Sequence, residues 1–161
     1  MKPFTIKRTP TSILAFLAFL CLALATVSTA HAQRRSGAIG LGGQIGEPSG
    51  VTLKLYNPNA VSYDFLAAWD LDDFFFLNVH GLFERHLGNN PDVHLFYGPG
   101  GFVGFRDRPE DDDTVAGISG TVGLGFLIEQ FEIYGQLTPR FSLIPQTDGD
   151  IGGGLGFRYY F

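Results

Sequence analysis

Cysteine is nearly absent from this 161-residue sequence. The single cysteine, Cys21, lies inside an apolar run near the N-terminus, and Leu20 stands where a lipoprotein has a small residue before its lipid-modified cysteine. Beyond that run the chain has no disulfide and no thiolate zinc site. Stabilisation of a small domain by disulfides is therefore excluded, and the leucine argues against a lipid anchor.

Basic residues are also scarce. The chain has 11 Lys and Arg residues against 16 Asp and Glu residues. Lys2, Lys7 and Arg8 precede the apolar run, so the part from residue 33 onward keeps 8 basic residues against the same 16 acidic ones, a net charge of −8. A chain with this charge is repelled by the phosphates of nucleic acids. We therefore expect no nucleic-acid partner.

The N-terminal segment has the layout of a secretory signal peptide. Basic residues come first, an apolar run from Ile13 to Val27 follows, and small residues end at Ala30-His31-Ala32. The run of about 15 residues is shorter than the roughly 20 that a spanning helix needs, which makes an uncleaved membrane anchor the less favoured alternative. The sequence predicts a signal peptide over residues 1–32 and a mature domain over residues 33–161.

The mature part contains eight segments that alternate with period two, and it shows no sustained helical periodicity. Turn-forming residues separate the segments, and Glu129-Gln130 forms a tight turn. Pro99 and the glycines near it indicate a bend or bulge in the fifth segment. The segments are 38–45, 51–56, 61–69, 74–85, 94–106, 116–128, 131–141 and 151–161. This pattern is typical of an all-β meander.

The two faces of these segments favour a membrane location. Large apolar residues occupy one face, whereas the other carries Gly, Ser and Thr with isolated charges instead of the dense Lys and Glu of a soluble surface. In an outer-membrane barrel the apolar face meets lipid and the small or polar face fills the lumen, and only a closed barrel satisfies its backbone in lipid. We therefore expect an all-β, eight-stranded antiparallel up-and-down transmembrane β-barrel in contact with outer-membrane lipids. Aromatic residues expected in the interfacial girdles are Tyr56, Trp69, Tyr97, Phe131, Phe141, Tyr159 and Phe161.

The last segment ends in alternating large residues, with Leu155 followed by Phe157, Tyr159 and Phe161. This pattern resembles the last-strand signal of outer-membrane barrel proteins. The resemblance implies that the barrel-insertion machinery recognises Phe157, Tyr159 and Phe161 during assembly.

Further stretches carry the resemblance along nearly the whole mature chain. They are Gly40 to Tyr56 (GLGGQIGEPSGVTLKLY), Gly98 to Phe105, and Leu143-Ile144-Pro145 together with Gly153 to Phe161. These stretches resemble an uncharacterised family of small outer-membrane barrels. The family implies an eight-stranded barrel similar to the transmembrane part of outer membrane protein A, with no established activity and no catalytic residues.

Charged residues on the small-residue face should lie inside the barrel. An unpaired charge there is costly, so opposite signs should meet, with Arg158 near Asp64 or Glu132. An eight-stranded barrel is just wide enough for its own side chains, which predicts a closed lumen filled by ion pairs. The expected charge network consists of Lys54, Asp64, Glu84, Glu132, Arg140 and Arg158.

Acidic residues gather in the connections expected to face the cell exterior. The simplest interpretation is a solvated rim, and the alternative is a site for Ca²⁺ or Mg²⁺, which prefer clustered oxygen ligands. The spacing does not match an EF-hand loop. The acidic residues are Glu47, Asp70, Asp72, Asp73, Asp107, Glu110, Asp111, Asp112, Asp113, Asp148 and Asp150.

An enzymatic role has few candidate residues. Some barrels of this size act on lipids with Ser, His and a carboxylate, and here only Glu84 with His80, His86 and His94 could contribute. No serine lies at a short spacing from them, and His86 and His94 are expected at a turn. We expect no catalytic residues and no cofactor.

The favoured hypothesis is a non-enzymatic outer-membrane barrel with a structural or interaction role. One alternative is a soluble periplasmic barrel that binds a small apolar ligand, which would need its large apolar residues to point inward. A lipid-modifying outer-membrane enzyme is the less favoured second alternative.

Overall fold

The computed structural model describes residues 34–69, 74–88, 91–106 and 113–161. The predicted signal peptide, residues 1–32, lies outside the described residues. Within the described ranges there is no helix of sufficient length and hydropathy to cross a membrane.

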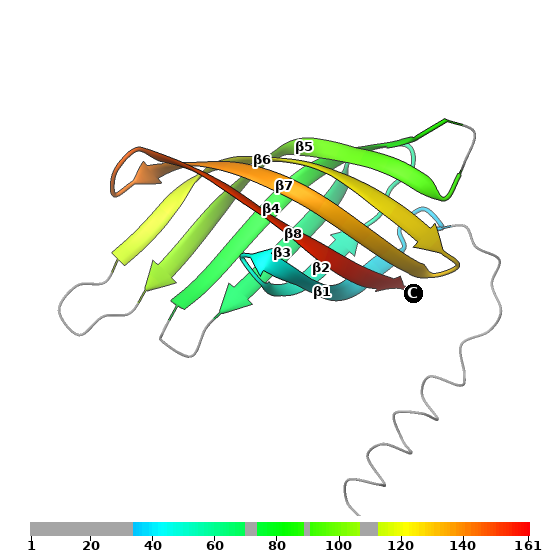
Figure 1. The fold of residues 1–161 in the computed structure, drawn as a ribbon, viewed down its shortest axis with the longest axis horizontal. Helices are drawn as coiled ribbons and strands as arrows, with labels where there is room; N and C mark the ends of the chain where they lie inside the picture. Colours follow the sequence, from blue (N-terminus) through cyan, green and yellow to red (C-terminus); the bar gives the residue numbers. More distant parts are fainter. Residues whose placement is uncertain (1–33, 70–73, 89–90, 107–112) are drawn as a thin grey trace, which may run out of the picture. The chain divides into compact units, whose positions relative to one another are not determined.

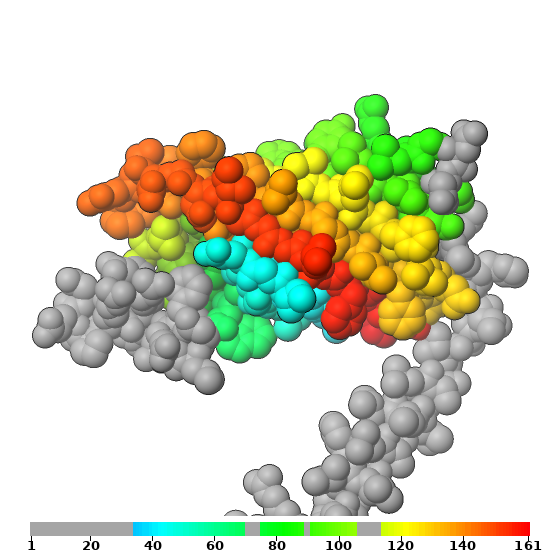
Figure 2. All heavy atoms as spheres, in the orientation of Figure 1, coloured from blue at the N-terminus to red at the C-terminus, as the bar shows by residue number. Residues whose placement is uncertain are grey.

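Eight strands form one closed barrel in chain order. Each strand pairs antiparallel with its neighbours, and β8 pairs with β1 to close the sheet. Figure 1 shows the strands in this order, and Figure 2 shows β8 and β1 side by side on the face in view. The predicted all-β, eight-stranded antiparallel barrel is thus confirmed. The strands are β1 (Ile39–Glu47), β2 (Gly50–Leu55), β3 (Ser62–Trp69), β4 (Phe74–His86), β5 (Val93–Arg106), β6 (Asp113–Ile128), β7 (Phe131–Ile144) and β8 (Asp148–Tyr160).

The two ends of the barrel differ in their connections. We call the end that carries the β2–β3, β4–β5 and β6–β7 turns the turn end, and the opposite end the loop end. The C-terminus lies at the turn end, because the Tyr160 amide donates to the Gln130 carbonyl and the Phe161 amide donates to the Ile39 carbonyl. Figure 1 shows the C-terminus beside the β6–β7 turn.

The barrel wall is uneven in height. β1, β2 and β3 have 9, 6 and 8 residues, whereas β4 to β8 have 13 to 16. β2 and β3 are therefore shorter than the 9 to 11 residues typical of tilted membrane strands. The pairing of β8 with β1 ends at Gly153, so residues 148–152 of β8 pair with β7 alone.

Side-chain exposure is the reverse of that in a water-soluble barrel. Large apolar residues point outward, with Ile151 73% and Leu155 65% exposed. Lys54, Glu132 and Arg158 are instead fully buried inside the barrel. The structure therefore confirms the prediction from the alternation that these apolar residues face outward and these charged residues face inward.

Large apolar side chains also lie inside the barrel, where we had expected small or polar residues. Leu82, Phe96 and Tyr134 form one buried cluster, and Phe76 stacks on Phe102 with ring centroids 5.6 Å apart. These rings fit because glycines on neighbouring strands leave room for them. A Cβ atom at Gly123 would overlap Phe96, and one at Gly156 would overlap Tyr134.

The ladder between β4 and β5 is interrupted beside Pro99, because paired residues stop at His80–Gly100 and resume at Phe83–Tyr97 without a change of register. β5 keeps a continuous register with β6 through Pro99, which pairs with Gly120. Pro99 has no partner in the register with β4, so its missing N–H removes no ladder hydrogen bond there. The register shift is between Ala116 and Gly117, where β6 pairs with β7.

Gly156→Ala should destabilise the barrel because the added methyl group would overlap the Tyr134 ring. The ring has little freedom to move, since Phe96 packs against its edge and the Arg158 guanidinium lies 3.9 Å from its centroid. We expect a loss of about 1–3 kcal/mol in the free energy of unfolding. Urea unfolding in lipid vesicles, followed by the fluorescence of Trp69, the single tryptophan, measures this loss.

Gly120→Ala is the matched control. Its Cβ would lie 3.8 Å from the Gly98 carbonyl oxygen, an ordinary contact. We expect a change within about 0.5 kcal/mol. An equal loss in both variants would show that the fit between Gly156 and Tyr134 has no special role.

Candidate functional site

The strand register places two pairs of opposite charges side by side on the inner face. Lys54 of β2 lies opposite Asp64 of β3, and Glu132 of β7 lies opposite Arg158 of β8. All four side chains are buried. Because β8 closes onto β1, these two pairs meet across the narrow lumen.

Arg158 contacts residues of three other strands. Its Nη2 donates to Asp64 Oδ1 at 2.6 Å, its Nη1 to Glu132 Oε2 at 3.4 Å, and its Nε to Thr52 Oγ1 at 3.2 Å. The guanidinium also lies 3.9 Å from the centroid of the Tyr134 ring. One planar group thus links β2, β3, β7 and β8, which suits the fixed fork of arginine donors.

Glu132 is the anion to which most of the cations converge. Its Oε1 lies 3.3 Å from Lys54 Nζ and 2.7 Å from His94 Nε2. Its Oε2 accepts hydrogen bonds from Arg158 and from the Tyr160 hydroxyl. This buried carboxylate therefore has partners on both oxygens, as a charge inside a protein requires.

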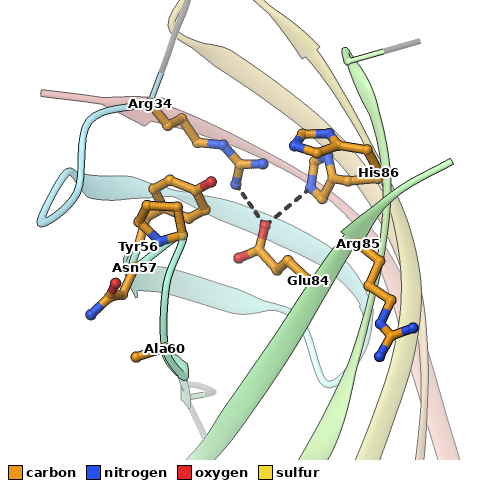
Figure 3. Close-up of a pocket in the computed structure, with 9 residues that line it drawn as sticks. Arg34, Tyr56, Asn57, Ala60, Glu84, Arg85 and His86 are labelled. Carbon is orange, nitrogen blue, oxygen red and sulfur yellow. Dashed lines mark ion pairs between the residues drawn. The ribbon is translucent and has the colours of Figure 1, made fainter. Parts of the chain in front are cut away.

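Glu84 carries the third negative charge. Its Oε1 lies 3.0 Å from Lys54 Nζ, and its Oε2 lies 3.1 Å from Arg34 Nη1 and 3.8 Å from His94 Nε2. Figure 3 shows the contact between Glu84 and Arg34. In the described part of the chain neither Glu84 oxygen has an aligned hydrogen bond, so its close contacts there are ion pairs.

Arg34 is a member of the site that sequence reasoning missed. It precedes β1, outside the alternating pattern, and its guanidinium lies 4.2 Å from the Tyr56 ring centroid and 5.2 Å from that of Tyr160. Burial acts to lower the pKa of Arg34, but Tyr160, Glu84 and Glu132 outweigh it, so the pKa is raised.

The sequence predicts that Tyr56 lies in an interfacial girdle, and this prediction is wrong. Tyr56 is buried at the turn end beneath Arg34, and burial raises the pKa of its phenol although the neighbouring Arg34 acts to lower it. The reason is that Tyr56 follows β2 on the inward side and packs with Ala38 and Tyr160.

We call Arg34, Lys54, Asp64, Glu84, Glu132 and Arg158 the ion-pair cluster. It contains three cations and three carboxylates, so its formal charges balance. Placing six charges inside a barrel carries a large desolvation cost, and removing one partner would leave another charge unpaired. Each of the six charges has an opposite charge within 3.3 Å.

His94 lies within this cluster. The sequence predicts a turn position for it, and this prediction is wrong. β4 continues to His86 and β5 already begins at Val93, so His94 is a strand residue with an inward side chain. Beside the Glu132 carboxylate its Nε2 acts as a donor, and its Nδ1 has no hydrogen-bond partner in the described part of the chain. His86, opposite it on β4, is exposed.

A second polar group lies farther toward the loop end. Arg140 pairs with Asp150 and lies 5.6 Å from the centroid of the Phe76 ring. It is therefore separate from the ion-pair cluster, although we had placed both in one network. Asp148 is exposed and accepts a hydrogen bond from the Gly149 amide at 2.8 Å.

His80 contacts a serine that is distant in the sequence. Ser119 Oγ lies 3.1 Å from His80 Nε2 and donates to Asn78 Oδ1 at 3.0 Å. No short motif could reveal this pair, because 39 positions separate the two residues. The serine is buried inside the barrel, so a substrate has little access to its hydroxyl.

Most of the acidic residues proposed for cation binding lie outside the described residues. Asp113 begins β6, and in the described ranges no three His, Cys, Asp or Glu side chains gather as a metal site. Those outside the described residues are Asp70, Asp72, Asp73, Asp107, Glu110, Asp111 and Asp112.

The aromatic residues of the expected insertion signal lie at the turn end. Phe157 and Phe161 are exposed on the outer surface. Tyr159 packs against Phe131 and Phe161, with ring centroids 5.0 Å and 4.9 Å apart. Its hydroxyl donates to the Gln130 side chain.

Glu132→Gln should destabilise the protein strongly, because it leaves three buried cations facing two carboxylates. We expect a loss of about 3–5 kcal/mol in the free energy of unfolding, measured by urea unfolding in vesicles. Adding Lys54→Gln restores the charge balance, so the double variant should lose less than the sum of the single losses.

Glu47→Gln is the control, since Glu47 is exposed at the end of β1. It should change the stability by no more than about 0.5 kcal/mol. Additive losses in the double variant would mean that the cluster does not act as a unit.

Comparison with known proteins identifies the fold but no family. No family model matches the chain, and no curated protein matches it. Among solved structures, the chain is similar to the N-terminal β-barrel domain of OprF from Pseudomonas aeruginosa, with a TM-score of 0.57 and 12% sequence identity. The match covers 77% of this chain and 96% of that domain. At this identity the likeness shows a shared barrel fold.

Proposed function

We propose that the mature chain is a non-enzymatic structural or interaction protein that spans the bacterial outer membrane. The observation that carries this proposal is the reversed distribution of side chains, with ion pairs inside and large apolar residues outside. Water would not favour such a surface, whereas the hydrocarbon core of a bilayer does. The signal peptide expected over residues 1–32 and the fold shared with the OprF domain agree with this location.

A filled lumen is the second part of the proposal. At the turn end lies the ion-pair cluster, which includes Arg34. The cluster of Leu82, Phe96 and Tyr134 lies against it through contacts such as that of Arg158 with Tyr134. Farther along, Asn78, His80 and Ser119 are joined by hydrogen bonds, and Phe76 and Phe102 pack with Ala68. These layers support a barrel that does not conduct ions.

The alternatives have less support. A soluble barrel for an apolar ligand needs a polar outer surface, whereas Ile45, Leu137 and Phe157 are all at least 60% exposed. A lipid-modifying enzyme needs its nucleophile to face the lipid, but Ser119 points inward. The role of the acidic loops in cation binding stays a prediction.

Membrane insertion can be tested directly. The purified protein should require detergent or lipid to remain monomeric, and its folded form should migrate differently on gels before and after heating. Proteolysis of vesicles that contain the protein should leave the strands protected. A mature chain that stays monomeric in buffer without detergent would rule out the membrane location.

Conductance tests the filled lumen separately. In planar bilayers the protein should show no large, steady single-channel currents, because side chains and ion pairs occupy the interior. An inserted protein that conducts steadily would keep the membrane location but refute the closed lumen.

A further inference from the structure

A shallow groove lies on the barrel at the turn end and borders the ion-pair cluster at Glu84. It has a volume of about 360 Å³ and lies between the β2–β3 turn and the outward residues of β4 and β5. Phe83 and Tyr97 form one side, with ring centroids 6.0 Å apart, and Val61 lies among the lining residues. Arg85 completes the lining with its positive charge.

Arg85 is unusual in its position. It follows the inward Glu84 on β4, so it belongs to the outward face, and its partner on β5 is the apolar Leu95. Among the Lys and Arg side chains that the structure describes within the strands, Arg85 alone is on the outward face. Lys54, Arg140 and Arg158 point inward. Figure 3 shows Arg85 directed away from Glu84.

The level of the groove across the proposed membrane follows from its neighbours. At the same end, Phe131, Tyr159 and Phe161 form a second aromatic group on the outer surface. Aromatic rings of a membrane barrel gather where the hydrocarbon core meets the headgroups. The groove then places apolar rings toward the acyl chains and an arginine at the level of the phosphates.

We propose that this groove binds one anionic phospholipid from the leaflet at the turn end, an inference that rests on the proposed membrane location. The Arg85 guanidinium pairs with the lipid phosphate, for which its planar donors are suited. Phe83 and Tyr97 contact the glycerol and the first methylenes of an acyl chain. Glu84 also lines the groove, but Lys54 and Arg34 already neutralise it, so the groove keeps the positive charge of Arg85.

Native mass spectrometry of the purified protein in detergent tests this proposal. The probes are phosphatidylglycerol, which is anionic, and zwitterionic phosphatidylcholine with the same acyl chains. We expect about fivefold greater retention of phosphatidylglycerol, the scale of one basic residue at an anionic surface. Excess inorganic phosphate should not displace the lipid, because it lacks the apolar contacts.

Variants assign the preference to the groove. Arg85→Gln should lose the preference, and Arg85→Lys should keep most of it because the charge remains. Arg35→Gln is the matched control, since Arg35 is exposed before β1 and does not line the groove. Loss of the preference in Arg85→Gln with retention in Arg35→Gln would support the proposal.

Three results would overturn it. They are equal retention of the two lipids by the unaltered protein, unchanged preference in Arg85→Gln, and release of the lipid by inorganic phosphate. The first and third need no variant, so they decide the matter even if Arg85→Gln fails to fold. Insertion into vesicles of phosphatidylcholine alone is measured in parallel. A protein that inserts without lipid preference contradicts only the groove, whereas one that does not insert contradicts the proposed function.

Discussion

The interior of this barrel depends on the pairing of Arg158 with two carboxylates. Arg158 belongs to the last strand, whereas Asp64 lies on β3 and Glu132 on β7. An arginine buried in this way is tolerated only when its partners are in place. The same contacts therefore provide its electrostatic compensation and hold the closing strand against the far wall of the lumen.

The other parts of the interior are arranged around this constraint. Tyr134 lies against the Arg158 guanidinium and needs Gly156 opposite it, because any larger residue there would overlap the ring. Lys54 connects the two glutamates at 3.0 and 3.3 Å. Polar and apolar layers thus alternate along the lumen, and each aromatic ring occupies space that a neighbouring glycine leaves free.

Much of this arrangement could be predicted from the sequence, because alternation alone assigns each side chain to a face. The number of strands followed from the turn residues, and the inward direction of Lys54 and Arg158 followed from the strand period. The contacts between inward side chains depend on the strand register and on the distance across the lumen. The alternation specifies neither of these. Arg34 was missed because it precedes the first strand, and the inward Phe96 and Phe102 were missed because large apolar residues were assigned to the outside.

The uneven strand lengths have a consequence for the surrounding bilayer. Six residues of β2 extend over about 20 Å before tilt, less than the hydrocarbon thickness of roughly 30 Å, whereas β6 has 16 residues. Under the proposed function, lipid beside β1–β3 must thin while lipid beside β5–β7 need not, a mismatch confined to one side of the circumference. In that setting the thinning would be confined to the lipid beside the three short strands.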